Sequence, residues 1–299
     1  MFEKLALIGC GLMGGSFALA ARQAQLVGSV CGYSRSPASA QKALELGIVD
    51  AVAATAAQCV RGADLVLIAV PVASTEATLR SFLPALSASA LVMDVGSTKA
   101  DVVQAAEQAL GERVGQFMPA HPICGKEVAG IEQADAGLYQ GQQVILTPLP
   151  SCHTPADIGR ASAVWSALGC RVRQMPPDEH DRAFAAVSHF PHMMAFALMR
   201  SLMAQPEGEQ FMAVAGPGFR DTTRIAAGDA DLWADVLLAN AREVIAQSRG
   251  LHAQLLELES MLQQRDRPAV RDFIARASAR RAAWRLGGPQ ASCDEKPQA

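Results

Sequence analysis

Polar side chains stand among glycine and proline residues in four separate parts of the chain. They are Asp94–Lys99, His121–Gly125, His180–His192 and Gly216–Arg224. Histidine has an ordinary pKa of about 6.5, so it can remove or return a proton at physiological pH. Arginine carries a planar fork of N–H donors that binds carboxylates and phosphates. These residue types make the four segments candidates for a site of acid–base chemistry.

A glycine-rich loop near the N-terminus indicates a ligand for such a site. The loop Gly9–Gly14 reads GCGLMG, follows the apolar segment Leu5–Ile8 and opens a helix-like stretch, which is the context of the dinucleotide fingerprint G-x-G-x-x-G. Gly9 permits the tight turn, Gly11 lets the backbone approach a pyrophosphate, and Gly14 lets the helix pack closely on the strand. The N–H groups at the helix start favour phosphate. The loop therefore predicts dinucleotide binding.

The end of the second expected strand bears on the choice of cofactor. An acidic residue there binds the ribose 2′-hydroxyl of NAD, but the chain reads Gly32-Tyr33-Ser34-Arg35. A hydroxyl and a guanidinium suit the 2′-phosphate of NADP. NADP is favoured, and NAD remains an alternative. The full set of predicted cofactor contacts is Gly9, Gly11, Leu12, Met13, Gly14, Ser34, Arg35, Val70, Pro71 and Ser97.

Short apolar runs alternate with helix-like stretches in the first half of the chain. Strands are expected at 5–8, 27–33, 64–70, 91–94, 114–118, 144–147 and 170–174, and helices at 14–25, 37–46 and 155–168. Apolar strands separated by helices are typical of a parallel sheet covered on both faces. We therefore predict an α/β fold, a doubly wound Rossmann-type domain with a mostly parallel sheet.

The pattern changes at Met175-Pro176-Pro177, and no convincing strand follows. Helices are expected at 178–203, 230–264 and 266–286, with a kink at Pro191 and a break near Gly250, because proline disrupts helical hydrogen bonding. The predicted organisation is a dinucleotide-binding domain at 1–175, an all-α domain at 176–288 and a frayed tail at 289–299.

The composition excludes several classes of protein. Half of the residues are hydrophobic and 18% are charged, which rules out a disordered chain. The net charge of −3 gives no overall attraction to nucleic acid or to an anionic membrane. The longest apolar run is far shorter than the ~18 residues of a membrane span. Seven scattered cysteines, without metal-ligand spacing, predict reduced thiols in the cytoplasm.

Six ordered motifs resemble the prephenate/arogenate dehydrogenase family of tyrosine biosynthesis. They are GCGLMGGS at 9–16, DVGSTK at 94–99, HPICG at 121–125, DEHD at 178–181, SHFPH at 188–192 and GFRDTTRIA at 218–226. The ordered set is far more specific than any single motif, and the resemblance runs from Leu5 to the region of residue 260. It implies a Rossmann domain followed by a helical dimerisation domain, and hence a homodimer.

The resemblance also implies a reaction. A nicotinamide cofactor, NADP or NAD, takes hydride from the carbinol carbon of prephenate. The ring carboxylate leaves as CO2, the ring becomes aromatic, and 4-hydroxyphenylpyruvate is formed. Family members that act on arogenate make tyrosine directly.

Two residues match the catalytic positions of the family. His121 is the candidate base, since removal of the hydroxyl proton assists the loss of hydride. Ser97 matches the serine that hydrogen-bonds the catalytic histidine near the nicotinamide. An alternative for Ser97 is the N-cap of a helix that starts near Thr98.

Further residues match the family's substrate site. Arg224 falls at the substrate-binding arginine, while Arg220 is a weaker candidate because that family position is simply basic. His192 is implied to contact substrate, and His180, which is expected near the site, is assigned to substrate binding as well. His189 is expected to be a core histidine. His189 and His192 have no third ligand at recognisable spacing, so no metal is expected.

The preference between prephenate and arogenate stays open. Glu127 would favour the ammonium group of arogenate, and the adjacent Lys126 argues the other way. Related Rossmann enzymes, such as β-hydroxyacid dehydrogenases, would use a lysine in the helical half, but the chain has none between Lys126 and Lys296. A non-enzymatic dinucleotide sensor would lack the catalytic positions, all of which are present.

Overall fold

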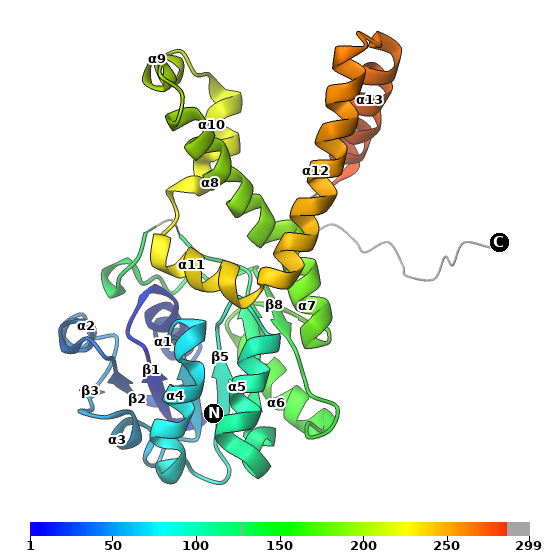
Figure 1. Ribbon diagram of the computed structural model, residues 1–299. Helices are drawn as coiled ribbons and strands as arrows, with labels where there is room; N and C mark the ends of the chain where they lie inside the picture. The colour runs from blue at the N-terminus through cyan, green and yellow to red at the C-terminus, as the bar shows by residue number, and fades with distance from the viewer. Residues whose placement is uncertain (127, 286–299) are drawn as a thin grey trace. The chain divides into compact units, whose positions relative to one another are not determined.

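The computed structural model describes residues 1–126 and 128–285 (Figure 1). By their internal contacts the residues form two compact units, Met1–Ile245 and the chain from Ala246 onward. The domain boundary expected near residue 175 stays a prediction. Within the described ranges, no helix has the length and apolar character needed to cross a membrane. Glu127 and the predicted tail at 289–299 lie outside the described residues.

Six parallel strands form the main sheet, in the order β3-β2-β1-β4-β5-β6. They are β1 (Phe2–Ile8), β2 (Val27–Tyr33), β3 (Ala51–Val52), β4 (Leu65–Ile68), β5 (Leu91–Asp94) and β6 (Phe117–Met118). The strand order reverses beside β1, and in such sheets ligands bind in the crevice at the carboxyl ends of the strands where the order reverses. The predicted α/β fold class is confirmed.

Helices cover both faces of this sheet. They are α1 (Leu12–Gln23), α2 (Pro37–Glu45), α3 (Ala56–Val60), α4 (Thr75–Phe82), α5 (Ala100–Leu110) and α6 (Pro155–Ala167), with short 3-10 turns η1 (Val72–Ser74), η2 (Leu83–Ala85), η3 (Gly111–Gln116) and η4 (Ile131–Gln133). Side chains of α1, α2 and α6 pack with Leu5 and Leu7 of β1. Those of α3, α4 and α5 pack with Ala6 and Ile8 on the other face, where Figure 1 shows α4 and α5 side by side. Alternate residues of β1 thus enter two cores.

A second, three-stranded sheet was not foreseen. It contains β7 (Ala120–Pro122), β8 (Gln143–Leu146) and β9 (Arg171–Gln174), in which β7 runs antiparallel to β8 and β9 runs parallel to β8. The sequence placed the strands now seen as β8 and β9 in one mostly parallel sheet with the others, and it did not predict β7. Pro119 separates β6 from β7, and a proline has no N–H to continue a ladder.

The described residues beyond β9 form no strand, as the sequence predicted. Their elements are α7 (Pro177–Phe184), the π-helical turn η5 (Ala185–His189), α8 (Phe190–Met203), α9 (Gly208–Ala213), α10 (Pro217–Thr223), the 3-10 turn η6 (Arg224–Ala227), α11 (Ala230–Ala239), α12 (Ala241–Gln263) and α13 (Arg267–Ala283). The interruption expected at Pro191 takes the form of η5, which directly precedes α8. The break expected near Gly250 is wrong, because α12 continues through that residue and the helix is interrupted at Asn240 instead.

A buried ion pair joins the two sheets. The ammonium group of Lys99 contacts the Asp94 carboxylate at the end of β5, and both side chains are almost wholly buried. Asp94 Oδ1 accepts the N–H of Ala120 in β7 at 2.9 Å, and Lys99 Nζ donates to the Ala120 carbonyl at 2.9 Å. The pair therefore fixes the start of β7 against the edge of the main sheet.

Loss of one partner of this pair is expected to destabilise the protein strongly. Asp94→Asn leaves the Lys99 charge buried without its counter-charge, which costs about 3–5 kcal/mol. Urea unfolding measures this. The double variant Asp94→Asn/Lys99→Met removes both charges and should recover part of the loss. A cost below about 1 kcal/mol for Asp94→Asn would contradict the assigned role.

Candidate active site

His121 is held inside a strand rather than in a loop after one. It is the central residue of β7, opposite Ile145 of β8, and only 9% of it is exposed. Its Nδ1 lies 2.8 Å from Nε2 of His180, and its ring centroid lies 4.8 Å from that of Phe184. The strand ladder and the two neighbouring rings therefore fix the orientation of the candidate base.

His180 lies behind His121 and is fully buried. Its Nδ1 is 2.8 Å from Oδ1 of Asp181, and its ring stacks on Phe184 at a centroid distance of 4.4 Å. Since its other nitrogen contacts His121, both ring nitrogens of His180 have protein partners. The geometry thus gives His180 a place near the site, as expected, but does not favour the substrate contact assigned to it from sequence.

Asp181 was missed as a site residue. Its carboxylate accepts the backbone N–H of Lys99 at 2.8 Å and that of Ala100 at 2.9 Å, at the start of α5. Its carbonyl accepts from Nδ2 of Asn240 at 2.7 Å. The only sequence signal was its place beside His180 in the DEHD motif. Its partners are distant in the chain, so spacing could not reveal them.

Burial keeps the histidines of this cluster neutral. It lowers the pKa of His121 well below the usual value, and the neighbouring His180, Lys99 and His189 lower it further. Burial also lowers the pKa of His180. Burial alone would raise the pKa of the Asp181 carboxyl, but hydrogen bonds from His180 and from backbone N–H groups hold it below its usual value. At neutral pH, two neutral imidazoles therefore lie next to one carboxylate.

Ser97 lies half-buried on the loop between β5 and α5. The hydrogen bonds among the described residues include none between the Ser97 hydroxyl and His121, whose Nδ1 pairs with His180 instead. The helix α5 has Lys99, not Ser97, at its N-cap. The role of Ser97 beside the catalytic histidine and the nicotinamide stays a prediction.

His192 and Arg224 come together, as the motif assignment requires of two substrate contacts. The guanidinium of Arg224, in η6, is close enough to add to the effect of burial in lowering the pKa of His192. His192 stacks on Trp233 with ring centroids 3.5 Å apart, and its Nδ1 is 2.9 Å from the carbonyl of Ser188. This carbonyl contact leaves the opposite ring edge, at Nε2, as the edge available to a ligand.

Arg220 is placed differently from Arg224. It is exposed and pairs with the adjacent Asp221, at 2.9 Å between Nε and Oδ1. Among the described residues, its side chain pairs with Asp221 and not with the cluster around His121. Its substrate contact stays a prediction.

His189 is buried, as the sequence predicted for a core histidine, but it is only partly satisfied. Nδ2 of Asn240 donates to its Nδ1 at 3.1 Å, whereas its Nε2 has no hydrogen-bond partner. Burial lowers its pKa to about 4, so the ring is neutral at physiological pH. Nowhere among the described residues do three or more histidine, cysteine or acidic side chains form a group suited to a metal ion.

The glycine loop has the shape that a dinucleotide phosphate requires. Gly9 has φ of +107°, and a Cβ there would lie 2.2 Å from the Ala69 carbonyl oxygen. A Cβ on Gly14 would lie 2.4 Å from the Gly9 oxygen. Gly11, by contrast, has open space around it and caps α1 without a side-chain hydrogen bond. The first N–H groups of α1 are therefore accessible to an anion.

The other predicted cofactor contacts follow the carboxyl ends of β1, β2 and β4 in the chain. Met13 is anchored in α1 by its carbonyl, which accepts from the Tyr139 hydroxyl at 2.7 Å. Arg35 follows β2 and is exposed, and Ser34 beside it accepts the N–H of Ser36 at 3.3 Å. Val70 and Pro71 follow β4, and Leu12 begins α1. Individual contacts of all these residues with the cofactor stay predictions.

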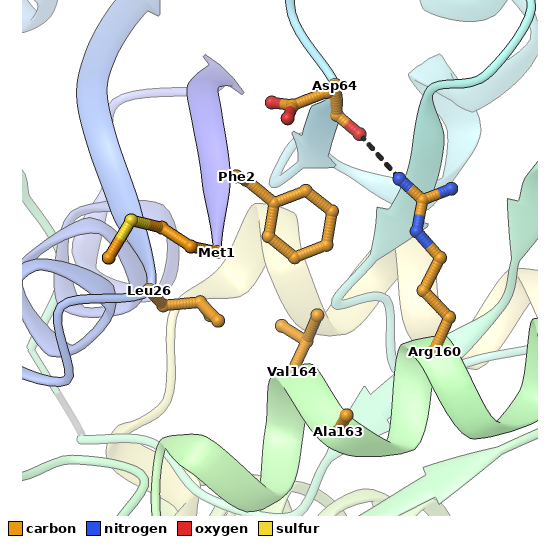
Figure 2. A pocket seen from close by; sticks show the side chains of 7 residues that line it. All are labelled: Met1, Phe2, Leu26, Asp64, Arg160, Ala163 and Val164. Atoms are coloured by element: carbon orange, nitrogen blue, oxygen red, sulfur yellow. Dashed lines mark hydrogen bonds between the residues drawn. The ribbon is translucent and has the colours of Figure 1, made fainter.

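A surface cavity of about 300 Å³ lies apart from the glycine loop (Figure 2). It is at the amino end of β1, whereas the glycine loop follows the carboxyl end. The guanidinium of Arg160 lies 5.2 Å from the Phe2 ring centroid and contacts the Asp64 carbonyl at 3.4 Å. The lining residues are Met1, Phe2, Leu26, Asp64, Arg160, Ala163 and Val164. The cavity is therefore lined neither by the glycine loop nor by the histidine cluster around His121.

Lys126, which the sequence makes a candidate for substrate discrimination, is bound within its own loop. Its ammonium group lies 3.1 Å from Oδ2 of Asp135 and 3.1 Å from the Gln133 carbonyl. A lysine that is already paired adds less positive charge to a neighbouring site. Glu127 lies outside the described residues, so the pair of opposing charges is described only in part.

Two family profiles match successive parts of the chain. Residues 17–174 match the prephenate dehydrogenase nucleotide-binding domain, and residues 176–276 match the prephenate dehydrogenase dimerization domain. The second profile begins with α7, the helix that carries His180 and Asp181.

Known proteins resemble the chain over most of its length. The cyclohexadienyl dehydrogenase of Zymomonas mobilis is 32% identical, with 89% of this chain and 90% of that protein covered. The prephenate dehydrogenase of Bacillus subtilis is 32% identical, covering 89% of this chain and 72% of that protein. The crystal structure of the A. aeolicus prephenate dehydrogenase with hydroxyphenyl propionate and NAD+ is 33% identical, covers 94% of this chain and 98% of that one, and has a TM-score of 0.87.

Proposed function

Because the chain belongs to the prephenate dehydrogenase family, we propose that it oxidatively decarboxylates prephenate to 4-hydroxyphenylpyruvate, with NAD or NADP as hydride acceptor. The resemblance seen in the sequence motifs is thereby confirmed at the level of the family. The chain is a nicotinamide-dependent oxidoreductase. The observation that carries the proposed chemistry is the buried, neutral His121 whose Nδ1 is engaged by His180, so that its Nε2 remains for the substrate.

The proposed reaction needs a proton acceptor and a hydride acceptor. We assign His121 to accept the proton of the carbinol hydroxyl as the C–H bond breaks. The nicotinamide, when bound, supplies the hydride acceptor. The electron pair of the bond to the ring carboxylate then enters the ring and CO2 leaves. The ring oxygen becomes a phenolate, which takes the proton back from His121 and ends as a phenol. A base already neutral at pH 7 needs no prior deprotonation.

The positive charge of Arg224 beside His192 suits the carboxylates of the substrate. An arginine fork binds a carboxylate bidentately, and its influence on the pKa of His192 places the two groups close together. We assign both to substrate binding, and we place Ser97 beside His121 and near the nicotinamide. Arogenate is an alternative substrate, because Lys126 is paired with Asp135 and leaves no clear preference for a keto group over an ammonium.

Steady-state kinetics test the reaction. Purified protein with prephenate and NAD or NADP should produce reduced cofactor, and His121→Gln should lower kcat by roughly 10²- to 10⁴-fold. Binding of the cofactor should persist in the variant. His252→Gln, at an exposed position on α12, is the matched control and should keep full activity. Undiminished turnover by His121→Gln would refute the base assignment, and no turnover with prephenate or arogenate would refute the reaction.

The cofactor preference is expected to depend on Arg35. Arg35→Ser removes a guanidinium that suits the 2′-phosphate, so kcat/KM with NADP should fall roughly 10- to 100-fold, while kcat/KM with NAD should change little. Arg61→Ser, at another exposed arginine, serves as the control. An equal effect on both cofactors, or none, would mean that Arg35 is only a surface residue.

A homodimer is the proposed assembly. The match to a dimerization domain over 176–276 supports it, as do large apolar side chains exposed on the helices, with Leu238 of α11 exposed to 76%. Isologous dimers are the commonest closed assemblies. The six cysteines in the described part of the chain are free thiols, which supports our placement of the protein in the reducing cytoplasm.

Light scattering tests the assembly. The mass should be about twice the 31.5 kDa of one chain. Leu238→Glu places a charge on an exposed apolar surface and should shift the protein towards monomer, because burying an unpaired charge is costly. Leu46→Glu, which changes a leucine exposed to 47% after α2, should leave the dimer intact. A wild-type mass of one chain would count against the dimer.

A further inference from the structure

We propose that His180 and Asp181 are positioning residues that fix the tautomer of His121, so that its Nδ1 carries the proton and its Nε2 is the basic nitrogen. This inference rests on the proposed role of His121 as the base, and it adds how the protonation state of each ring nitrogen of His121 is set. It follows from the direction in which each hydrogen bond of the chain His121–His180–Asp181 must run.

The direction is set at the Asp181 end. Oδ1 of Asp181 accepts the backbone N–H of Lys99 at 2.8 Å, and Oδ2 accepts that of Ala100 at 2.9 Å. Burial alone would raise the pKa of this carboxyl, but its hydrogen bonds hold the pKa below the usual value. At neutral pH the group is therefore a carboxylate, which has no proton to donate. The contact between Asp181 Oδ1 and Nδ1 of His180, at 2.8 Å, therefore needs a proton on the histidine nitrogen.

The remaining assignments follow in order. A neutral imidazole carries one N–H, so a proton on Nδ1 of His180 leaves a lone pair on its Nε2. That lone pair lies 2.8 Å from Nδ1 of His121, which must therefore donate. A neutral His121 then has its own lone pair on Nε2. The carboxylate thus determines, through one intervening ring, which His121 nitrogen can take a proton.

The surroundings keep this chain from rearranging. The ring of Phe184 stacks on His180 at 28° between ring planes, and it also lies against His121. Nδ2 of Asn240 donates to the Asp181 carbonyl and holds α7 at this point. With His180 fully buried, water cannot replace either hydrogen bond. Rotation of either imidazole would leave a buried polar atom without a partner, which is costly.

The titratable and charged groups around His121 determine how stable its protonated form would be. They are His180 and Asp181 of α7, His189 of η5, Lys99 before α5 and Asp94 of β5. Lys99 is paired with Asp94, but its charge still lowers the pKa of His121. The Asp181 carboxylate is then the charge that stabilises an imidazolium at His121, through the intervening ring. Its removal should lower the pKa of His121 in the substrate complex.

The first measurement is direct observation of the tautomer. Ring ¹⁵N NMR shifts distinguish protonated from unprotonated nitrogens, and the His121 signals are assigned by their loss in His121→Gln. The wild-type protein should show Nδ1 protonated and Nε2 unprotonated. Asp181→Asn presents an amide in place of one acceptor and should change this pattern. A wild-type His121 protonated on Nε2 would overturn the proposal, and this result does not depend on any activity.

The second measurement is the pH dependence of kcat with prephenate and saturating cofactor. Asp181→Asn should lower kcat at neutral pH by roughly 10²- to 10⁴-fold with KM within about threefold of wild type. The acid limb of kcat should move to lower pH, because loss of the negative charge lowers the pKa of His121. A role confined to folding would not move this limb. An unchanged kcat and pH profile would overturn the proposal.

Further variants separate the proposal from loss of folding and from failure of the proposed reaction. Asp178→Asn changes an exposed carboxylate of the same helix and should leave tautomer and kcat unchanged. His180→Gln keeps an acceptor for Nδ1 of His121 and should lower kcat less than His180→Leu, which keeps none. If Asp181→Asn does not fold, this ranking decides, and equal kcat values in the two His180 variants would refute the proposal. If the wild type lacks dehydrogenase activity, the NMR result decides alone.

Discussion

The buried contact between Lys99 and Asp94 is the constraint on which the candidate site depends. Without solvent, each charge requires the other, and both also bind Ala120 at the start of β7. The position of Ala120 determines where the next residue, His121, lies. The backbone N–H of Lys99 also donates to the Asp181 carboxylate. One ion pair thus connects the end of the main sheet, the strand of the candidate base and the helix behind it. Burying two charges costs desolvation free energy, and here the buried pair holds these three elements in a fixed arrangement.

Much of the main sheet could be predicted from the sequence. The strands β2 and β5 have the predicted bounds, because apolar runs that end at polar or turn residues are local signals. The two-residue strand β3 carries no such signal. The second sheet was missed because the pairing of β7 with β8 depends on contacts between distant segments. The interruption at Asn240 likewise depends on a distant partner, since its side chain binds Asp181.

The candidate site shows the same limit. Motifs predicted roles for His121, His192 and Arg224, because residue types at fixed spacing are visible in one chain. They did not predict the contacts of Asp181, whose side chain accepts hydrogen bonds from backbone groups far away in the chain. They also suggested a substrate contact for His180, whose ring nitrogens both have protein partners. The sequence reveals which side chains are available for chemistry, but only tertiary contacts reveal how each is oriented.

The π-helical turn η5 has a consequence for the phase of the helix that follows. An α-helix turns by about 100° per residue, and a π turn adds one residue to a helical circuit. Everything in α8 is therefore rotated relative to α7 by about that angle. His192 faces Trp233 in this phase, and the apolar side chains of Met194 and Leu198 are exposed in it as well. The single extra residue of η5 therefore sets both the direction of the His192 ring and the face of α8 that is exposed.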